Sequence, residues 1–294
     1  MKQLVLISSF LAFLLFSCGN DDSDAFNEQL ALDILNIDEY LETNNIQTEI
    51  HSSGIRYVVE VEGTGDAPSF GDDIAVKYEA FLLTNDRRVI DEDTIGFTIN
   101  LSSTVVEAWQ IMLPTMNEGG SITFYAPSVY CFGEDGSVVP RNSNLIYRVE
   151  LLARVDDENE QQQVDEAIID EFLLENGIAH EIDDSGIRFS TITEGTGDNP
   201  VDTSRVEVIY EGSFLNGSEF DASNDAEPPV FQLQDLIEAW QIMLPTVMEG
   251  GSIKIYTPSR YGYGSTGNSS IPPNTILVFE IELLSIVAEE DDAE

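Results

Sequence analysis

The chain has 294 residues, of which 42% are hydrophobic, and it carries 55 acidic residues against 12 basic ones. This hydrophobic content is too high for a disordered chain, and the length suits two domains of ordinary size. The formal net charge of −43 repels nucleic-acid phosphates, which excludes DNA and RNA as expected partners. We interpret the charge as a source of solubility in preference to an acidic binding tail.

An apolar run at residues 4–16 opens the chain. It is too short to span a bilayer and has the length of the hydrophobic region of a signal peptide. The run ends at Ser17-Cys18, in a context that resembles a bacterial lipobox. The resemblance implies a signal peptide at residues 1–17 and a tri-acylated Cys18 that holds the protein to a membrane by its acyl chains. The alternative is an ordinary cleaved signal whose cysteine is incidental.

Residues 18–26 form a predicted acidic linker after the lipidated cysteine. Residues 19–24 resemble the acidic export signal of surface lipoproteins in the Bacteroidetes, and a solvated linker is an equally good interpretation. We therefore expect a cell-envelope protein that is lipid-anchored to the outer membrane, on either its periplasmic or its external side. If Cys18 is acylated, Cys131 has no intramolecular disulfide partner.

A nine-residue sequence, EAWQIMLPT, occurs at residues 107–115 and again at residues 238–246. Shorter segments repeat in the same order at a separation of 132 residues: 37–41 with 169–173, 53–57 with 185–189, 62–66 with 194–198, and 149–152 with 281–284. Solenoid repeats have periods of roughly 20–50 residues. The longer period therefore predicts a duplicated domain.

Each copy begins with a predicted helix, at residues 28–44 and 156–176, where apolar side chains recur at helical spacing. The predicted organisation is an N-terminal helix at 27–52, a first domain at 53–155, a linker helix at 156–176, a second domain at 177–287 and an acidic tail at 288–294. The helices either pair two chains or cover their own domains.

Strand-like runs follow each helix. They lie at residues 56–61, 74–83 and 121–126 in the first copy and at 188–193, 206–214, 252–257 and 275–285 in the second. Asn216-Gly217 predicts a hairpin turn after the second of these strands in copy two.

The repeated EAWQIMLPT segment is the predicted short helix among the strands. Thr104 and Glu107, and likewise Asp235 and Glu238, have the spacing of a capping box. Prolines 114 and 245 must kink or end the regular helix, and the glycine pairs 119–120 and 250–251 are predicted to stop it. Helical spacing predicts a buried Trp240.

The second copy resembles the FKBP-type peptidyl-prolyl cis-trans isomerases. Six motifs in family order carry the resemblance: VIYEG at 208–212, NGSEFD at 216–221, FQL at 231–233, LIEAW at 236–240, YGYG at 261–264 and IPPNTILVF at 271–279. The first copy resembles the family more loosely. The resemblance implies an α+β fold of two FKBP-like domains, each with a bent antiparallel sheet around a short helix and a shallow aromatic pocket.

The resemblance also implies a set of site residues in copy two: Tyr210, Phe220, Asp221, Phe231, Ile237, Trp240, Tyr263, Ile271 and Phe279. Trp240 would form the floor under the proline ring, and the Ile237 N–H and the Tyr263 hydroxyl would hold substrate carbonyls. Asp221 would orient pocket groups. The substrates would be X–Pro segments of exported client proteins, with no cofactor and no metal. Pro229 departs from the aromatic or large apolar residue that is frequent there.

Copy one carries degenerate counterparts of this set: Tyr78, Asp91, Val106, Trp109, Phe132 and Tyr147. Phe132 lacks the hydroxyl of Tyr263, and Ile90 stands where copy two has Phe220. We therefore expect both copies to fold and prolyl isomerisation to reside mainly in the second.

Other functions have weaker support. Residues 262–267 spell G-x-G-x-x-G, but residues 270–273, SIPP, follow in place of the helix that a dinucleotide site needs. The two histidines have no zinc-ligand spacing. The competing function is a non-catalytic module that binds or docks proline-containing peptides, and a plain spacer suits copy one better than copy two.

Overall fold

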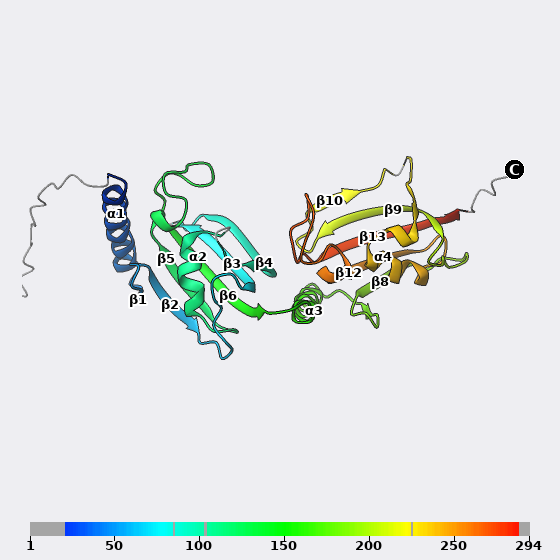
Figure 1. Cartoon of the computed structure of the whole chain (residues 1–294), viewed down its shortest axis with the longest axis horizontal. Coiled ribbons are helices and arrows are strands. Elements are labelled where there is room, and N and C mark those ends of the chain that lie inside the picture. Colours follow the sequence, from blue (N-terminus) through cyan, green and yellow to red (C-terminus); the bar gives the residue numbers. More distant parts are fainter. Residues whose placement is uncertain (1–20, 85, 103–104, 225, 288–294) are drawn as a thin grey trace, which may run out of the picture.

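The computed structural model describes residues 21–84, 86–102, 105–224 and 226–287. They form two domains that are joined by one helix, as Figure 1 shows. The predicted signal peptide, Cys18, Thr104 and the acidic tail lie outside the described residues. No helix in the described part of the chain is long and apolar enough to cross a bilayer.

Both domains contain an antiparallel sheet. In the first domain the strand order is β1-β2-β5-β6-β3-β4, with β1 (Glu49–Ile50), β2 (Arg56–Val61), β3 (Asp73–Leu82), β4 (Val89–Asn100), β5 (Ser121–Ala126) and β6 (Leu145–Val155). In the second the order is β10-β9-β13-β12-β8-β7, with β7 (Glu181–Ile182), β8 (Arg188–Thr193), β9 (Arg205–Phe214), β10 (Glu219–Ala222), β12 (Ser252–Thr257) and β13 (Leu277–Val287), and β11 (Val230–Gln232) also pairs with β9. The predicted α+β fold of two domains, each with an antiparallel sheet and a short helix, is confirmed.

Most of the predicted strand boundaries agree with the structure. β2, β5, β8 and β12 have the predicted bounds, and β3, β9 and β13 differ by one or two residues. The Asn216-Gly217 turn is confirmed, because Gly217 has a φ of 83° and the Phe214 N–H bonds the Ser218 carbonyl at 2.9 Å. Edge strand β4 was not predicted, since its sequence VIDEDTIGFTIN is rich in acidic residues, which are uncommon in strands.

The short helices α2 (Glu107–Met112) and α4 (Glu238–Met243) lie against the concave side of each sheet. The predicted capping boxes are wrong: the N-cap residues are Val106 and Ile237, neither of which makes a side-chain cap. Asp235 instead ends a 3₁₀ turn, η3 (Leu233–Asp235), whose following residues are extended, so that its carboxylate is too early in the chain to cap α4.

Proline ends the regular part of each short helix, as predicted. Two 3₁₀ turns, η1 (Leu113–Thr115) and η4 (Leu244–Thr246), directly follow α2 and α4, and Pro114 and Pro245 are their second residues. The prediction that glycines stop the helices is wrong. Gly119 and Gly250, with φ of 75° and 77°, instead make the later turn into the next strand, where a left-handed backbone is needed.

Helix α1 (Asp21–Thr43) covers its own domain. Ile37, Tyr40 and Leu41 are buried on the outer side of the sheet, in a cluster with Phe81, Tyr125 and Ile146. The acidic segment predicted as a linker is helical from Asp21 onward, which corrects that part of the predicted boundary. Acidic residues near a helix N-terminus are favourable because they face the positive end of the helix dipole.

Helix α3 (Glu158–Glu175) is more than the predicted linker. Ile169 and Leu173 are fully buried and cluster with Tyr256 of β12, so the helix completes the second domain as α1 completes the first. The helix also contacts the first domain, because the Gln161 amide donates to the Thr98 hydroxyl at 2.9 Å and Glu171 pairs with Lys77 at 2.7 Å. α3 is therefore a shared structural element of both domains.

A buried carboxylate of α3 makes a pH-dependent contribution to stability. Asp165 is 1% exposed and accepts a bond from the Ser259 N–H at 2.7 Å and from the Gln161 amide at 2.6 Å. Burial, the largest effect, raises the pKa of Asp165 to about 6, although the bonds from Ser259 and Gln161 lower it. The folded state therefore holds this proton more tightly than the unfolded state does.

We expect Asp165→Asn to flatten the pH dependence of unfolding. A raised folded-state pKa stabilises the protein below the unfolded pKa of about 3.9, and this contribution, up to about 3 kcal/mol, disappears as the pH rises through about 6. Urea unfolding of the full chain from pH 4.5 to 7 measures the slope. Equal slopes for the variant and the natural chain would contradict this expectation.

Candidate active site

Trp240 of α4 is the centre of an aromatic cluster in the second domain. Its side chain is 4% exposed, and three rings stand nearly perpendicular to it: Tyr210 of β9 at 5.2 Å, Phe279 of β13 at 5.6 Å and Phe231 of β11 at 6.3 Å, measured between ring centroids. Edge-to-face packing of this kind is favourable beyond the area it buries. In this cluster the indole of Trp240 is therefore surrounded by aromatic rings that stand perpendicular to it.

Phe220 of β10 extends the wall beside Phe279, at 5.7 Å and 90°. Gly212 of β9 makes room for it, since a Cβ atom there would lie 2.8 Å from Phe220 Cζ. Phe214 packs on the other side of Phe220 at 5.2 Å. The sequence motifs did not assign roles to Gly212 or Phe214, although a glycine inside a strand is the usual signal of such a close approach.

A hydrogen bond joins Tyr210 to Asp221. The Tyr210 hydroxyl donates to Asp221 Oδ2 at 2.8 Å. Burial first, and then this bond to a carboxylate, raise the pKa of Tyr210 to about 12. The phenol therefore stays protonated at neutral pH, and the geometry fits an orienting role for Asp221 better than an acid–base role.

The other expected site residues lie at the edges of the cluster. Ile271 is buried in it and Ile237 is half-buried against it. Within the part of the chain that the structure describes, no acceptor bonds the Ile237 N–H, so this donor is available to a substrate. Tyr263 is 37% exposed on the loop after η5 (Ser259–Tyr261), at the rim. The structure thus brings seven of the nine residues into one apolar cluster, with Asp221 bound to it and Tyr263 beside it.

The first domain keeps the same scaffold. Trp109 of α2 has Tyr78 at 5.0 Å and Tyr147 at 6.0 Å, both nearly perpendicular to it. The Tyr78 hydroxyl donates to Asp91 at 2.6 Å, as Tyr210 does to Asp221. Val106 and Phe132 pack against the core of this domain.

Two paired exchanges alter the pocket around that scaffold. Where the second domain has Gly212 and Phe220, the first has Ala80 and Ile90, so that a methyl group takes the space that the phenylalanine ring needs. Where the second domain has Gly262 and Phe279, the first has Cys131 and Tyr147.

The second exchange brings two polar groups together. The Cys131 thiol and the Tyr147 hydroxyl lie close enough to influence each other's pKa, and burial, the largest effect, raises the pKa of both groups. Cys131 keeps the backbone of Gly262, with φ of −117° against −102° and ψ of −107° in both. The hydroxyl that Tyr147 adds to the pocket therefore lies next to the thiol that Cys131 adds, and the first domain is repacked at this pair of positions.

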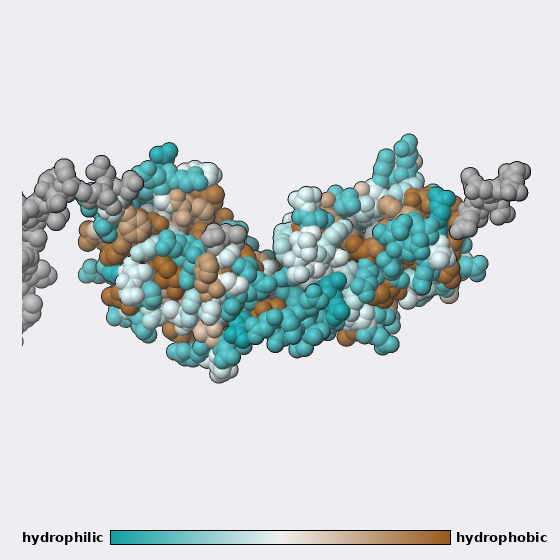
Figure 2. Space-filling model, in the orientation of Figure 1, coloured by the Kyte–Doolittle hydropathy of each residue, from teal (hydrophilic) through white to brown (hydrophobic). Residues whose placement is uncertain are grey.

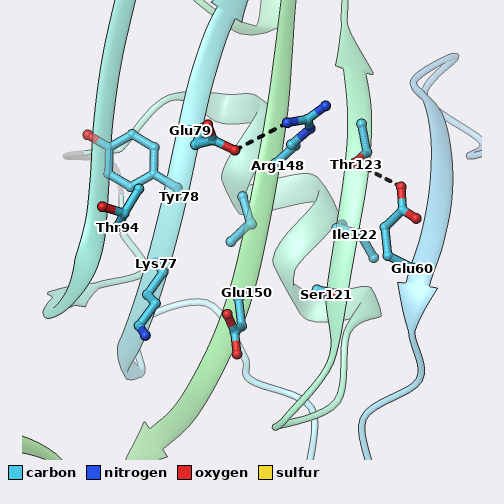
Figure 3. Close-up of a pocket in the computed structure, with 11 residues that line it drawn as sticks. Glu60, Lys77, Tyr78, Glu79, Thr94, Ser121, Ile122, Thr123, Arg148 and Glu150 are labelled. Carbon is cyan, nitrogen blue, oxygen red and sulfur yellow. Dashed lines mark hydrogen bonds and ion pairs between the residues drawn. The ribbon is translucent and has the colours of Figure 1, made fainter. Parts of the chain in front are cut away.

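A hollow of about 580 Å³ lies elsewhere, on the outer face of the first sheet (Figure 3). Its charged side chains are largely paired: Arg148 with Glu79 at 3.3 Å, and Lys77 with Glu171 of α3 at 2.7 Å. Glu60 accepts a bond from Thr123 at 3.1 Å. These pairs belong to a solvent-facing sheet surface, and within the described residues no group of His, Cys, Asp and Glu could hold a metal ion.

The chain resembles proteins of known sequence and structure. Escherichia coli K12 FKBP-type peptidyl-prolyl cis-trans isomerase FkpA is 36% identical over 118 residues, covering 40% of this chain and 43% of FkpA. Its Aeromonas hydrophila counterpart is 38% identical over 114 residues, covering 37% and 42%. The crystal structure of E. coli FkpA matches with a TM-score of 0.39 at 32% identity, over 44% of this chain and 62% of that one.

The chain therefore spans less than half the length of these curated relatives. The family model described as FKBP-type peptidyl-prolyl cis-trans isomerase matches twice, at residues 65–152 and 197–284, which is more than half of the chain. Each match contains the short helix and most of the strands of one sheet, from β3 in the first domain and from β9 in the second. The chain belongs to the family of FKBP-type peptidyl-prolyl cis-trans isomerases, with two such domains in tandem.

Proposed function

We propose that the chain is a peptidyl-prolyl cis-trans isomerase (rotamase) that acts on X–Pro segments of exported proteins and assists their folding, mainly through the second domain. The observation that carries this proposal is the cluster of perpendicular rings around Trp240, with Gly212 leaving space for Phe220. The matching positions of the first domain are occupied by Ala80 and Ile90.

The chemistry needs no nucleophile. Rotation about an amide breaks its resonance against a barrier of about 18–20 kcal/mol, so X–Pro bonds isomerise over tens of seconds or longer. The twisted amide is less polar than either planar form, and an aromatic pocket can therefore favour it over the ground state. In this proposal the proline ring lies on Trp240, and the Ile237 N–H and the Tyr263 hydroxyl hold substrate carbonyls.

The two domains support different functions. The alternative, a non-catalytic module that binds proline peptides, suits the first domain, because it keeps Tyr78, Asp91 and Trp109 but has lost the wall of Phe220. The second domain retains each predicted site residue within or beside one cluster. We therefore place catalysis in the second domain and weak binding, at most, in the first.

We expect Tyr263→Phe to lower kcat/KM for an X–Pro tetrapeptide by about two- to twelve-fold. This corresponds to the loss of one hydrogen bond worth about 0.5–1.5 kcal/mol, at tenfold per 1.4 kcal/mol. The measurement is cis-to-trans isomerisation by the full chain, with circular dichroism to confirm folding. Phe132→Tyr, the matched exchange in the first domain, should leave the rate unchanged. A full chain that is folded yet inert on a range of X–Pro peptides would leave the binding module as the better function.

We also propose that the protein is a lipoprotein, anchored to the outer membrane by acyl chains on Cys18. The support is the lipobox-like context of Cys18, and helix α1 begins three residues later at Asp21. The first domain would then lie nearer to the membrane than the second.

Intact-mass measurement of the membrane-extracted protein tests this anchor. A mature chain that begins with a diacylglycerol-modified Cys18 is the expected result, and an unmodified N-terminus would rule it out. Protease treatment of intact and lysed cells determines on which side of the outer membrane the protein lies. Cleavage in intact cells indicates the external side, and cleavage only after lysis indicates the periplasmic side.

A further inference from the structure

A cavity of about 580 Å³ lies at the junction of the two domains, directly beside the candidate active site. We call it the junction cavity. The first domain contributes Asp73, at the start of β3, and the second contributes Glu238 and Tyr263. Glu238 follows Ile237, whose free N–H faces the substrate in our proposal, so the cavity continues from the rim of the pocket. Figure 2 shows a notch between the domains, with hydrophilic surface along its base.

The junction cavity is strongly acidic. Five carboxylate side chains line it: Asp73, Asp156, Asp157, Glu158 and Glu238. Arg260 is the one basic residue among its described lining residues; its guanidinium donates to the Gln162 side chain at 2.8 Å and lies over the ring of Tyr261, so one positive charge stands against five carboxylates. The cavity therefore has an excess of negative charge beside the site.

Two of these carboxylates are the most available to a ligand. Asp157 caps α3 by accepting bonds from the N–H groups of residues 159 and 160, and Asp156 pairs with Arg154 at 2.6 Å. Glu158 and Glu238 form no ion pair with any residue that the structure describes, and neither does Asp73, which accepts a bond from the Asn100 amide at 2.7 Å. A cation that enters the cavity would thus meet unpaired negative charge.

An independent feature also calls for a hydrogen-bond donor. Gln161 lines the cavity and is only 5% exposed. Its amide nitrogen donates to Thr98 and Asp165, which determines how the amide is turned, and its Oε1 atom is buried without a donor among the described residues. Buried acceptors are normally satisfied by protein or by ordered water, so this oxygen is an acceptor that the donor of a ligand can satisfy.

We infer that the junction cavity is a subsite for a lysine or arginine side chain of the substrate, a few residues from the isomerised proline. This inference rests on the proposed isomerase function. Ammonium and guanidinium groups carry positive charge and only hydrogen-bond donors, which matches carboxylates and an unpaired carbonyl oxygen. The first domain, whose own pocket is repacked, would then contribute Asp73 to the substrate specificity of the second.

The test uses the full chain and a set of peptides that share one X–Pro core. Lysine, glutamine or glutamate is placed two or three residues before or after the proline, and kcat/KM and the dissociation constant are measured for each. At one of these positions we expect the lysine peptide to exceed the glutamate peptide by about tenfold at low salt. The ratio should shrink at high salt, because exposed charges are then screened.

Two double variants distinguish an effect of the cavity on the lysine-to-glutamate ratio from an effect of the overall negative charge of the protein. Asp73→Asn with Glu158→Gln should reduce the lysine-to-glutamate ratio to about threefold or less. Asp184→Asn with Glu282→Gln removes the same charge from exposed positions outside the cavity and should leave the ratio intact. Equal reduction by both pairs would show that net charge alone causes the preference, and would overturn the inference.

The remaining outcomes distinguish the two proposals. If glutamine peptides are isomerised but lysine and glutamate peptides behave alike at every position, the subsite is wrong and the isomerase stands. If no peptide is isomerised, the proposed function fails, and the dissociation constants decide whether the cavity prefers lysine.

Discussion

Replacing Phe220 with alanine in the full chain is expected to lower kcat/KM for prolyl isomerisation by about 10- to 100-fold. Phe220 stands edge-on to Phe279 and occupies the space left by Gly212. Its removal opens an apolar wall to water, and burial of such a side chain is worth about 1.5–3 kcal/mol, at tenfold per 1.4 kcal/mol. The measurement is the isomerisation rate of an apolar X–Pro tetrapeptide, with unfolding curves to show that the domain remains folded.

The matched variant is Ile90→Ala, at the same position of the first domain. It should leave the rate of the full chain unchanged, because catalysis is assigned to the second domain. Equal losses from the two variants would mean that both domains are active. A folded Phe220→Ala protein with full activity would remove the aromatic wall from the mechanism.

The second large effect concerns helix α3. A fragment of residues 177–287 should be unfolded or only marginally stable, whereas residues 157–287 should fold. Ile168, Ile169 and Leu173 of α3 are buried, and each contributes about 1.5–3 kcal/mol. The sum approaches the whole stability of a typical domain, about 5–15 kcal/mol. Trp240 is the one tryptophan of either fragment and reports urea unfolding by its fluorescence.

Neighbouring leucines of α3 provide the control in the full chain. Leu173 is fully buried and Leu174 is 81% exposed. We expect Leu173→Ala to cost about 2–5 kcal/mol and Leu174→Ala to cost little. Equal stability of the two fragments would show that α3 is a linker, as its position in the sequence first indicated.

The packing of side chains against one another explains why the sequence motifs described the site incompletely. A motif records which residue types recur, and it found each member of the ring cluster around Trp240. It did not show that Gly212 and Phe220 change together, or that Cys131 and Tyr147 do. The members of each pair are not adjacent in the sequence, and only their packing in the folded domain makes the size of one residue depend on the other.

The sequence by itself determined the duplication, most of the longer antiparallel strands and the burial of Trp240, because hydrophobic period and repeated motifs are local properties of a chain. The beginnings of α2 and α4 required the structure, since the residues before them are extended and place Asp235 out of capping reach. The tertiary structure alone decided that α3 belongs to the core of the second domain, and that Asp73 of the first domain lines the same cavity as Tyr263 of the second. Arrangements of this kind join segments that are distant in the sequence, such as Leu173 with Tyr256 and Asp73 with Tyr263, and only the folded chain brings them together.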